Sequence, residues 1–323
     1  MTVVAILEDN HAAFLEAPGF KALQGRAEIR VIRQRVIPPE RASILKDVDV
    51  VVGLRERTRF DADFLKDAPN LKLIVQTGRI GPNVDQEAIT KAGVLLASTP
   101  GGNSNSTVEL TFGLMMALMR QIPQSYQNLR QGRWEVPYGR SLGGKTLGIV
   151  GMGRIGSQVA EIAGRGFGMK VLGWSRSMTS ERAAKVGAES ALLDDLLRTS
   201  DVVSVHLALN DGTRGLLSAE KLALIRPSAY LVNTARGPLL DEPALTRMLA
   251  EGKLAGAALD VYWEEPLPAS SPLLELDNVV LTPHVGWPAD SGLLAYAEGA
   301  AEVVAAYLNG NPINIANPEA ARA

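Results

Sequence analysis

The chain has 323 residues, of which 46% are hydrophobic and 21% charged, and its mean hydropathy is +0.06. This balance is typical of a globular protein of about two domains and argues against a disordered chain. The formal net charge is −2, so no charge surplus indicates binding to nucleic acid or to an anionic membrane. Without cysteine, disulfides, thiolate nucleophiles and cysteine-ligated metals are excluded, and we predict no metal site. Imidazoles come only from His11, His206 and His284.

Apolar, β-branched runs alternate with helical patterns over the first half of the chain. The runs are apolar almost without alternation, as in strands that are buried on both faces of a parallel sheet. They predict strands at 3–7, 29–32, 48–52, 71–75 and 94–97. A long helix is predicted from 106 to 119, after the Asn/Ser/Thr-rich stretch 103–107.

A second series of strands and helices begins near residue 146. Its predicted strands are 147–150, 170–174, 202–206, 230–233, 257–259 and 279–281. A helix is predicted to close the chain at 289–308. The longest nearly uncharged helical run covers about half of the roughly 20 residues that a bilayer span needs. With no signal-peptide pattern at the start, we expect a cytoplasmic protein with no membrane partner.

Two doubly wound α/β domains account for these two series. Pro100–Gly102 is the predicted first crossing between them, and 283–288 is the predicted second crossing, because the closing helix follows it. The first domain is then discontinuous, with residues 1–102 and 286–323, and it surrounds an inserted domain of residues 103–285. In such folds ligands bind at the carboxyl ends of the strands, and a cleft between domains is the default site.

Gly151, Gly153 and Gly156 form a G-x-G-x-x-G turn directly between a predicted strand and a predicted helix. In that context the first glycine allows the tight turn, the second lets the backbone approach a pyrophosphate, and the third lets helix and strand pack closely. The helix N-terminus favours the anion. The turn therefore predicts a bound dinucleotide.

The end of the next strand indicates which dinucleotide is bound. NAD-binding sites usually place an acidic residue there for the ribose 2′-hydroxyl. This chain has Ser175 and Arg176 instead, and an arginine suits a 2′-phosphate. The sequence favours NADP(H), with NAD(H) as the alternative in which Arg176 is simply solvated.

Three further motifs follow the glycine turn. They are LVNTARG at 231–237, GAALDVY at 256–262 leading to Glu265-Pro266, and LTPHVG at 281–286. With the turn, they resemble the D-isomer-specific 2-hydroxyacid dehydrogenases, the family of glyoxylate/hydroxypyruvate reductases and phosphoglycerate dehydrogenases, over essentially the whole chain. The resemblance implies a Rossmann cofactor domain inserted into a flavodoxin-like substrate domain. It also implies hydride transfer between NAD(P)H and a small 2-oxo or D-2-hydroxy acid.

By this resemblance, Arg236, Glu265 and His284 stand at the family's catalytic positions. A histidine suits proton transfer near neutral pH, and a carboxylate beside it favours the imidazolium and orients the ring. An arginine can anchor the substrate and stabilise charge that develops on its oxygen. Glu264 adjoins Glu265, but the residue just before the proline is the predicted partner of His284.

The resemblance implies further contacts to the two ligands. The cofactor residues are Thr107, Arg154, Ile155, His206, Thr213, Thr234, Asp260 and Gly286, and the substrate residues are Arg55, Gly78, Arg79, Ile80 and Trp287. Backbone N–H groups around 78–80 are predicted to cradle a carboxylate. Arg79, Ile80 and Trp287 depart from the family pattern. Arg79 either reaches a second anionic group or points outward, and Trp287 is a candidate for the pocket wall.

The segment Gln131–Trp134 resembles the arm through which family members dimerise, so a homodimer is implied. The alternative is that Trp134 caps its own domain.

Two other functions fit parts of the pattern, namely a formate-dehydrogenase-like enzyme and a non-enzymatic, dinucleotide-sensing corepressor-like protein. The formate enzymes usually lack the carboxylate found at Glu265, and the complete set of Arg, Glu and His argues against a purely binding role.

Overall fold

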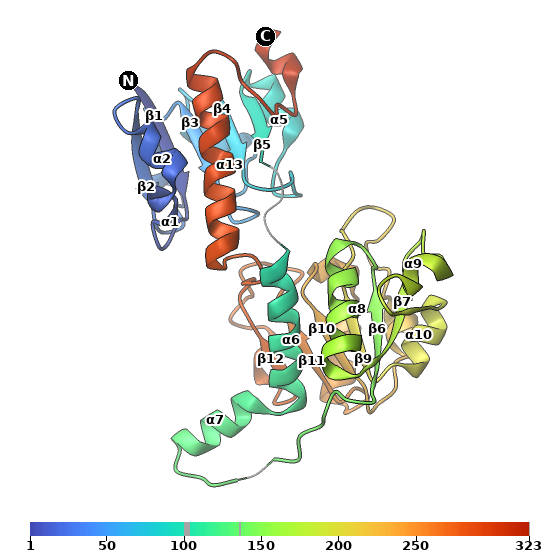
Figure 1. Ribbon diagram of the computed structural model, residues 1–323. Coiled ribbons are helices and arrows are strands. Elements are labelled where there is room, and N and C mark those ends of the chain that lie inside the picture. Colours follow the sequence, from blue (N-terminus) through green and yellow to red (C-terminus); the bar gives the residue numbers. More distant parts are fainter. Residues whose placement is uncertain (100–103, 136, 323) are drawn as a thin grey trace. The chain divides into compact units, whose positions relative to one another are not determined.

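The computed structural model describes residues 1–99, 104–135 and 137–322 (Figure 1). The chain divides into two compact units. Unit 1 comprises Met1–Asn103 with Pro288–Ala323, and unit 2 comprises Ser104–Trp287. The predicted crossing Pro100–Gly102 lies outside the described residues. Among the described helices, none is long and apolar enough to cross a membrane.

Unit 1 contains a five-stranded parallel sheet with the order β2-β1-β3-β4-β5, which is the flavodoxin-like order. Its strands are β1 (Thr2–Leu7), β2 (Ala27–Ile32), β3 (Val50–Gly53), β4 (Leu73–Gln76) and β5 (Leu95–Ser98). Its helices are α1 (Ala13–Glu16), α2 (Pro18–Leu23), α3 (Glu40–Leu45), α4 (Ala62–Asp67), α5 (Gln86–Lys91) and α13 (Asp290–Leu308), and the 3-10 helix η3 (Pro318–Arg322) follows.

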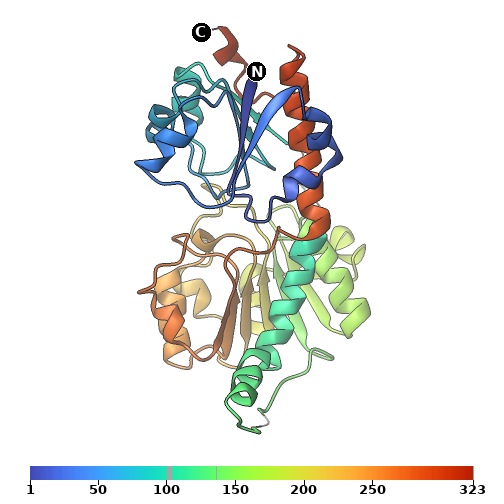
Figure 2. The same ribbon diagram turned by 90° about the vertical axis from the view of Figure 1, so that its left-hand side faces the viewer.

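Successive side chains of the unit 1 strands face opposite sides of the sheet, and both sides are covered. On one side Val51 and Ile74 pack with Phe64 of α4 and Ile89 of α5. On the other side α13 packs on β4 and beside α1 and α2, an arrangement that both ribbon views show (Figures 1 and 2). The continuous apolar runs of the sequence arise from this double coverage.

Unit 2 contains a seven-stranded parallel sheet with the order β12-β11-β10-β9-β6-β7-β8. Its strands are β6 (Thr146–Val150), β7 (Lys170–Trp174), β8 (Glu189–Ser190), β9 (Val202–Val205), β10 (Tyr230–Asn233), β11 (Gly256–Leu259) and β12 (Val279–Leu281). Its helices are α6 (Asn105–Met119), α7 (Ile122–Arg130), α8 (Arg154–Phe167), α9 (Ser180–Ala184), α10 (Leu193–Thr199), α11 (Ala219–Leu222) and α12 (Glu242–Ala250), with 3-10 helices η1 (Gly237–Leu239) and η2 (Pro272–Glu275).

Neighbouring residues of the unit 2 strands enter two different cores. Val202 and Val232 face the core that α6 and α8 cover, whereas Val203 and Leu231 face the core that α10, α11 and α12 cover. The chain reverses its direction of winding between β6 and β9, which are adjacent in the sheet. Open sheets bind ligands outside the carboxyl ends of the strands at such a point. The predicted fold class, two doubly wound parallel-sheet domains, is therefore confirmed.

Some predicted elements are corrected in their bounds. The strands predicted to start at Val48, Leu71 and Val94 begin two, two and one residues later, at Val50, Leu73 and Leu95. Each of these three residues is buried, but its N–H donates to a carbonyl of the preceding helix or turn instead of a strand. Neither the two-residue edge strand β8 nor the polar helix α7 was predicted.

Candidate active site

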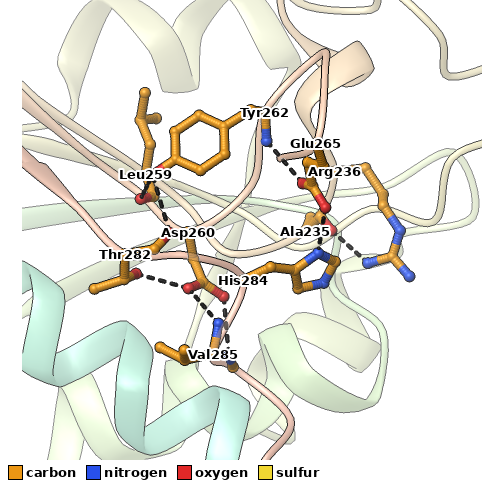
Figure 3. A network of polar contacts seen from close by, with 10 residues as sticks. Ala235, Arg236, Leu259, Asp260, Tyr262, Glu265, Thr282, His284 and Val285 are labelled. Atoms are coloured by element: carbon orange, nitrogen blue, oxygen red, sulfur yellow. Dashed lines mark hydrogen bonds and ion pairs between the residues drawn. The ribbon is translucent and has the colours of Figure 1, made fainter. Parts of the chain in front are cut away.

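His284 and Glu265 form a direct pair at the carboxyl edge of the unit 2 sheet. His284 lies in the loop after β12, and Glu265 lies in the loop after the neighbouring strand β11. The imidazole Nδ1 lies 2.7 Å from Glu265 Oε2 (Figure 3). The two side chains are 24% and 34% exposed, so a small molecule can still reach the pair.

The Glu265 carboxylate is held in its ionised form. Burial alone would raise its pKa, but the hydrogen bond and charge of His284, the N–H of Tyr262 and the charge of Arg236 together lower it below its ordinary value. The Tyr262 N–H donates to Glu265 Oε1 at 2.9 Å, which leaves Oε2 for the imidazole. Of the two adjacent glutamates, the structure brings Glu265, and not Glu264, to His284.

Arg236 is positioned by the turn that ends β10. The buried Asn233 amide spans this turn, because its oxygen accepts from Ala235 N–H and its nitrogen donates to Arg236 O, both at 3.0 Å. The Arg236 guanidinium donates from Nη1 to Ala235 O at 2.6 Å. Figure 3 shows the guanidinium on the same side of the loops as the His284 ring. The three predicted catalytic side chains are thus brought together within unit 2.

The backbone of His284 is held in a conformation that few residues adopt. Its φ is +54°, in the left-handed region, where residues other than glycine are strained. The buried Asp260 carboxylate accepts hydrogen bonds from residues on both sides of His284. Its Oδ1 accepts from Thr282 Oγ1 at 2.6 Å and from Val285 N–H at 2.8 Å, and its Oδ2 accepts from Gly286 N–H at 2.9 Å. Asp260 therefore fixes the loop that carries the imidazole.

Asp260 was predicted to contact the cofactor, and these hydrogen bonds give it a further role. Burial raises the pKa of its carboxyl, and the hydrogen bonds from the His284 loop partly offset this effect. Both oxygens already accept bonds within the protein, so this carboxylate has a structural role in positioning His284 that the sequence motif did not reveal.

The glycine turn has the space that its motif requires. Gly151 has φ +111°, and a Cβ there would lie 2.7 Å from the backbone of His206. A Cβ on Gly156 would collide with the Gly151 carbonyl oxygen, whereas one on Gly153 would meet nothing within 4 Å. Gly153 is the N-cap of α8, and within the described part of the chain no side chain caps that helix end. Arg154 and Ile155 begin the helix. An open helix N-terminus of this kind fits a pyrophosphate.

Ser175 and Arg176 follow β7, as predicted. Ser175 Oγ is buried and has no hydrogen-bond partner in the part of the chain that the structure describes. The Arg176 guanidinium lies against Gly212, because a Cβ there would be 3.1 Å from Nη1. Among the described residues no carboxylate pairs with Arg176. An orphaned hydroxyl and an unpaired guanidinium fit a phosphate group.

The remaining predicted cofactor residues are partly engaged with one another. Thr107 Oγ1 donates to Gly286 O at 2.7 Å, and the Thr111 and Thr234 hydroxyls lie 3.0 Å apart. The buried Thr213 hydroxyl is bonded within its own loop, to Ala208 O at 2.7 Å. These threonines therefore shape the loops at this edge, and their contact with a cofactor remains a prediction.

His206 differs sharply from His284. Burial lowers its pKa to about 4, so its imidazole is neutral at physiological pH. Its Nε2 lies 2.8 Å from the buried Ser204 hydroxyl. A neutral ring next to Gly151 suits a supporting role beside a cofactor better than proton transfer.

The predicted substrate residues of unit 1 lie after β3 and β4. Arg55 is partly buried, Gly78 is buried, Arg79 is exposed and Ile80 is intermediate. The Gly78 N–H donates to Thr99 Oγ1 at 2.8 Å, so it is not available to cradle a carboxylate as predicted. Trp287, at the end of unit 2, is 8% exposed.

Sequence reasoning did not single out Asn233, Ser204 or Tyr262. Asn233 and Tyr262 lie inside the quoted motifs, but nothing in a linear pattern shows which backbone groups a side chain will hold. A polar residue at the buried end of an otherwise apolar strand, as at Ser204 and Asn233, was the available signal.

Comparison with known proteins identifies the family. The model of the D-isomer specific 2-hydroxyacid dehydrogenase NAD binding domain matches residues 112–286. A glyoxylate reductase of Aeropyrum pernix is 42% identical over 271 residues, which are 81% of this chain and 81% of that protein. A D-3-phosphoglycerate dehydrogenase of Methanocaldococcus jannaschii is 40% identical over 84% of this chain, and the match spans 53% of that longer protein.

The solved structures agree with the sequence relatives. A crystal structure of an oxidoreductase from Ralstonia solanacearum matches with a TM-score of 0.92 and 36% identity, over 99% of this chain and 98% of that one. Four motifs, two sheet topologies and these similarities lead to one conclusion. The chain belongs to the D-isomer-specific 2-hydroxyacid dehydrogenase family.

Proposed function

We propose that the protein reduces a small 2-oxo acid to the D-2-hydroxy acid, with His284 as the proton donor. A bound nicotinamide dinucleotide supplies a hydride to carbon 2, and one proton is added to the carbonyl oxygen, which balances the two-electron reduction. The observation that carries this proposal is the 2.7 Å contact of His284 Nδ1 with Glu265 Oε2 beside Arg236.

In this proposal the proton comes from one particular nitrogen of His284. Because Nδ1 of His284 is engaged by Glu265, Nε2 is the nitrogen that donates to the substrate oxygen. The ionised Glu265 accepts from Nδ1 of His284 and keeps the ring from rotating. In the oxidative direction the same Nε2 accepts the hydroxyl proton.

Arg236 completes the site as an anion-binding group. Its planar guanidinium can hold the substrate carboxylate or carbonyl oxygen through two parallel N–H donors. Such donors lower the barrier most when they face the oxygen on which negative charge develops. The Asn233 turn keeps Arg236 at this edge before substrate binds.

We assign the two ligands to the two units. Unit 2 takes the dinucleotide, supported by the open space at Gly153, the uncapped N-terminus of α8 and the matched NAD binding domain model. Unit 1 supplies contacts for the acid from the loops after β3 and β4. This assignment follows the predicted division into a substrate-binding and a dinucleotide-binding domain.

A spectrophotometric screen tests the activity. Oxidation of NADH and NADPH is followed with glyoxylate, hydroxypyruvate, pyruvate, phenylpyruvate and branched 2-oxo acids. We expect turnover with at least one of them. Reduction of NAD(P)⁺ by formate alone, or dinucleotide binding without turnover of any acid, would contradict the proposal.

For the cofactor, we propose a preference for NADP(H) over NAD(H). The buried, unpartnered Ser175 hydroxyl and the unpaired Arg176 support it. Replacement Ser175→Asp places a carboxylate against the 2′-phosphate. We expect the ratio of kcat/KM for NADPH to that for NADH to fall at least about tenfold, or 1.4 kcal/mol.

Steady-state kinetics with both dinucleotides measure this ratio. Ser270→Asp, on an exposed loop of the same unit, is the matched control for added charge and should leave the ratio unchanged. A wild-type preference for NADH, or a ratio that Ser175→Asp does not move, would show that this loop does not select the cofactor.

We also propose that two copies associate through α7. Figure 1 shows this helix lying away from the seven-stranded sheet of its unit. Ile122, Tyr126 and Leu129 lie on one helical face and are 53%, 63% and 59% exposed. Trp134 is 86% exposed, so it does not cap its own unit. Exposed aromatic residues at this density are typical of an interface.

Disrupting the α7 face should separate the copies. We expect Tyr126→Glu to raise the dimer dissociation constant at least about 30-fold, or 2 kcal/mol, because a charge replaces an interface aromatic. Sedimentation velocity over a concentration series gives the constant. Gln127→Glu, an exposed position on the same helix, adds equal charge and should leave the dimer intact. A monomeric wild type at micromolar concentration would refute the interface.

A further inference from the structure

The loops that carry Arg236 and His284 leave the unit 2 sheet at strands that are not neighbours. Arg236 follows β10 and His284 follows β12, and β11 lies between these two strands. In the proposed reaction both side chains act on one small acid, and a misplacement of about 1 Å can cost a hundredfold in rate. Contacts that fix one loop relative to the other are therefore expected to matter for catalysis.

One such contact joins the His284 loop to the helix α6. Thr107 Oγ1 of this helix donates to Gly286 O at 2.7 Å. The Gly286 N–H donates to Asp260 Oδ2 at 2.9 Å, so both backbone polar groups of this glycine are held. A Cβ on Gly286 would lie 3.0 Å from Asp260 Oδ2 and 3.6 Å from Thr107 Cγ2. The absence of a side chain therefore lets the loop approach the helix this closely.

A second contact joins the Arg236 turn to α6, one helical turn further along. Thr111 is fully buried, and its hydroxyl lies 2.8 Å from Thr107 O and 3.0 Å from Thr234 Oγ1. Because a carbonyl oxygen can only accept, Thr111 donates to Thr107 O and accepts from the Thr234 hydroxyl. Thr234 stands two residues before Arg236, inside the turn that the Asn233 amide spans.

The bond from Thr111 to the carbonyl four residues earlier assigns no role by itself, since threonines inside helices often make it. Thr199 of α10 makes the same bond, to Asp195 O at 2.7 Å, from an exposed position. Thr111 differs in two respects. Its neighbours on the buried side of α6 include the apolar Val108 and Met115, and its hydroxyl also accepts from another element. A valine of similar shape would fill this place without a polar group, so the hydroxyl points to a positioning role.

We infer that Thr107 and Thr111 are positioning residues that set the placement of His284 relative to Arg236. The inference rests on the proposed function. Positions four apart lie on the same face of a helix, one above the other, so a single rigid element holds both loops. Neither hydroxyl needs to touch the substrate, because Thr107 acts through the His284 loop and Thr111 acts through the Arg236 turn.

Valine variants test the inference, because they remove each hydroxyl and keep the branched shape. We expect Thr107→Val and Thr111→Val each to lower kcat/KM for the 2-oxo acid at least about tenfold. The loss should appear mainly in kcat for Thr107→Val, which displaces the proton donor, and also in KM for Thr111→Val, which displaces the anchor. Melting temperatures should stay within about 3 °C of wild type.

Conservative variants and a matched control separate positioning from packing. Thr107→Ser and Thr111→Ser keep the hydroxyl and should show kinetics within about threefold of wild type, or 0.7 kcal/mol. Thr199→Val removes a hydroxyl that bonds only within α10 and should leave the kinetics unchanged. Wild-type kinetics in both valine variants, or losses that serine does not recover, would overturn the inference while the proposed function stands.

Hydrogen–deuterium exchange of the protein without ligands gives a readout that does not require turnover. We expect Thr107→Val to speed exchange at least about tenfold in peptides that cover 284–287, and Thr111→Val to do so in peptides that cover 234–237. Failure of the wild type to reduce any 2-oxo acid would contradict the proposed function. The exchange rates would still decide the inference, because unchanged exchange in both valine variants would show that α6 does not hold the two loops.

Discussion

Replacement of His284 by alanine should lower kcat by roughly 10²- to 10⁴-fold, the usual contribution of a positioned general acid. In the proposed mechanism the imidazole donates from Nε2 to the substrate oxygen, and Glu265 on Nδ1 has no proton of its own to donate because its pKa lies below the ordinary value. The KM for the 2-oxo acid should change much less than kcat, because Arg236 and the unit 1 loops remain.

Because the backbone of His284 is in the left-handed region, a second variant is needed to separate loss of the imidazole from backbone strain. Because its φ is +54°, alanine adds local strain, whereas asparagine tolerates the left-handed region well. His284→Asn should therefore keep the wild-type melting temperature and show a similar loss of kcat. His11→Ala removes an exposed imidazole elsewhere and should leave the kinetics unchanged. Turnover within a few-fold of wild type in both His284 variants would eliminate the general-acid role.

Much of the fold could be predicted because burial on both faces leaves a simple mark on the sequence. Strands such as Tyr230–Asn233 and Val279–Leu281 are found at the predicted residues. The errors occur at residues that are buried but do not pair with a neighbouring strand. Val48 and Val94 are as buried as the strands that follow, but their N–H groups close the preceding helix or turn. Hydropathy alone cannot distinguish these two cases.

The strand β8 and the helix α7 escaped prediction for different reasons. β8 has only two residues and pairs with β7 at the sheet edge, which is too short for any periodic pattern. The helix α7 is rich in Gln, Ser and Asn, and its apolar residues face outward rather than into a core. Without burial, the pattern that indicates a helix is weak.

For the candidate site, the sequence predicts which residues are involved. It does not predict the hydrogen bonds and backbone conformations that hold them in position. The motifs indicate Arg236, Glu265 and His284, and the structure brings these side chains together. The left-handed His284 and the Asp260 carboxylate that brackets it depend on hydrogen bonds between β11 and β12 loops. The Gly78 N–H, predicted to be free, is taken by Thr99 at the end of the neighbouring strand. Such bonds join residues that are distant in sequence.

Arg236→Lys is expected to cost roughly 10²- to 10³-fold in kcat/KM, or about 3–4 kcal/mol, comparable to the loss of one transition-state hydrogen-bond donor. Lysine keeps the charge but replaces a planar, bidentate fork with a single flexible ammonium. It also cannot retain both the Nη1 bond to Ala235 O, at 2.6 Å, and a fork directed at the substrate. A positive charge without the planar geometry of the guanidinium should therefore not support normal catalysis.

The separate effects of Arg236→Lys on KM and kcat distinguish two roles of Arg236. If the guanidinium only anchors the carboxylate, Arg236→Lys raises KM and leaves kcat nearly unchanged; if it also stabilises the developing charge on the oxygen, kcat falls as well. We expect both to change, because Arg236 lies beside the His284–Glu265 pair. Arg198→Lys, on the exposed side of α10, is the matched control and should show wild-type kinetics. A near-normal kcat/KM in Arg236→Lys would show that a point charge suffices and that the fork geometry has no catalytic part.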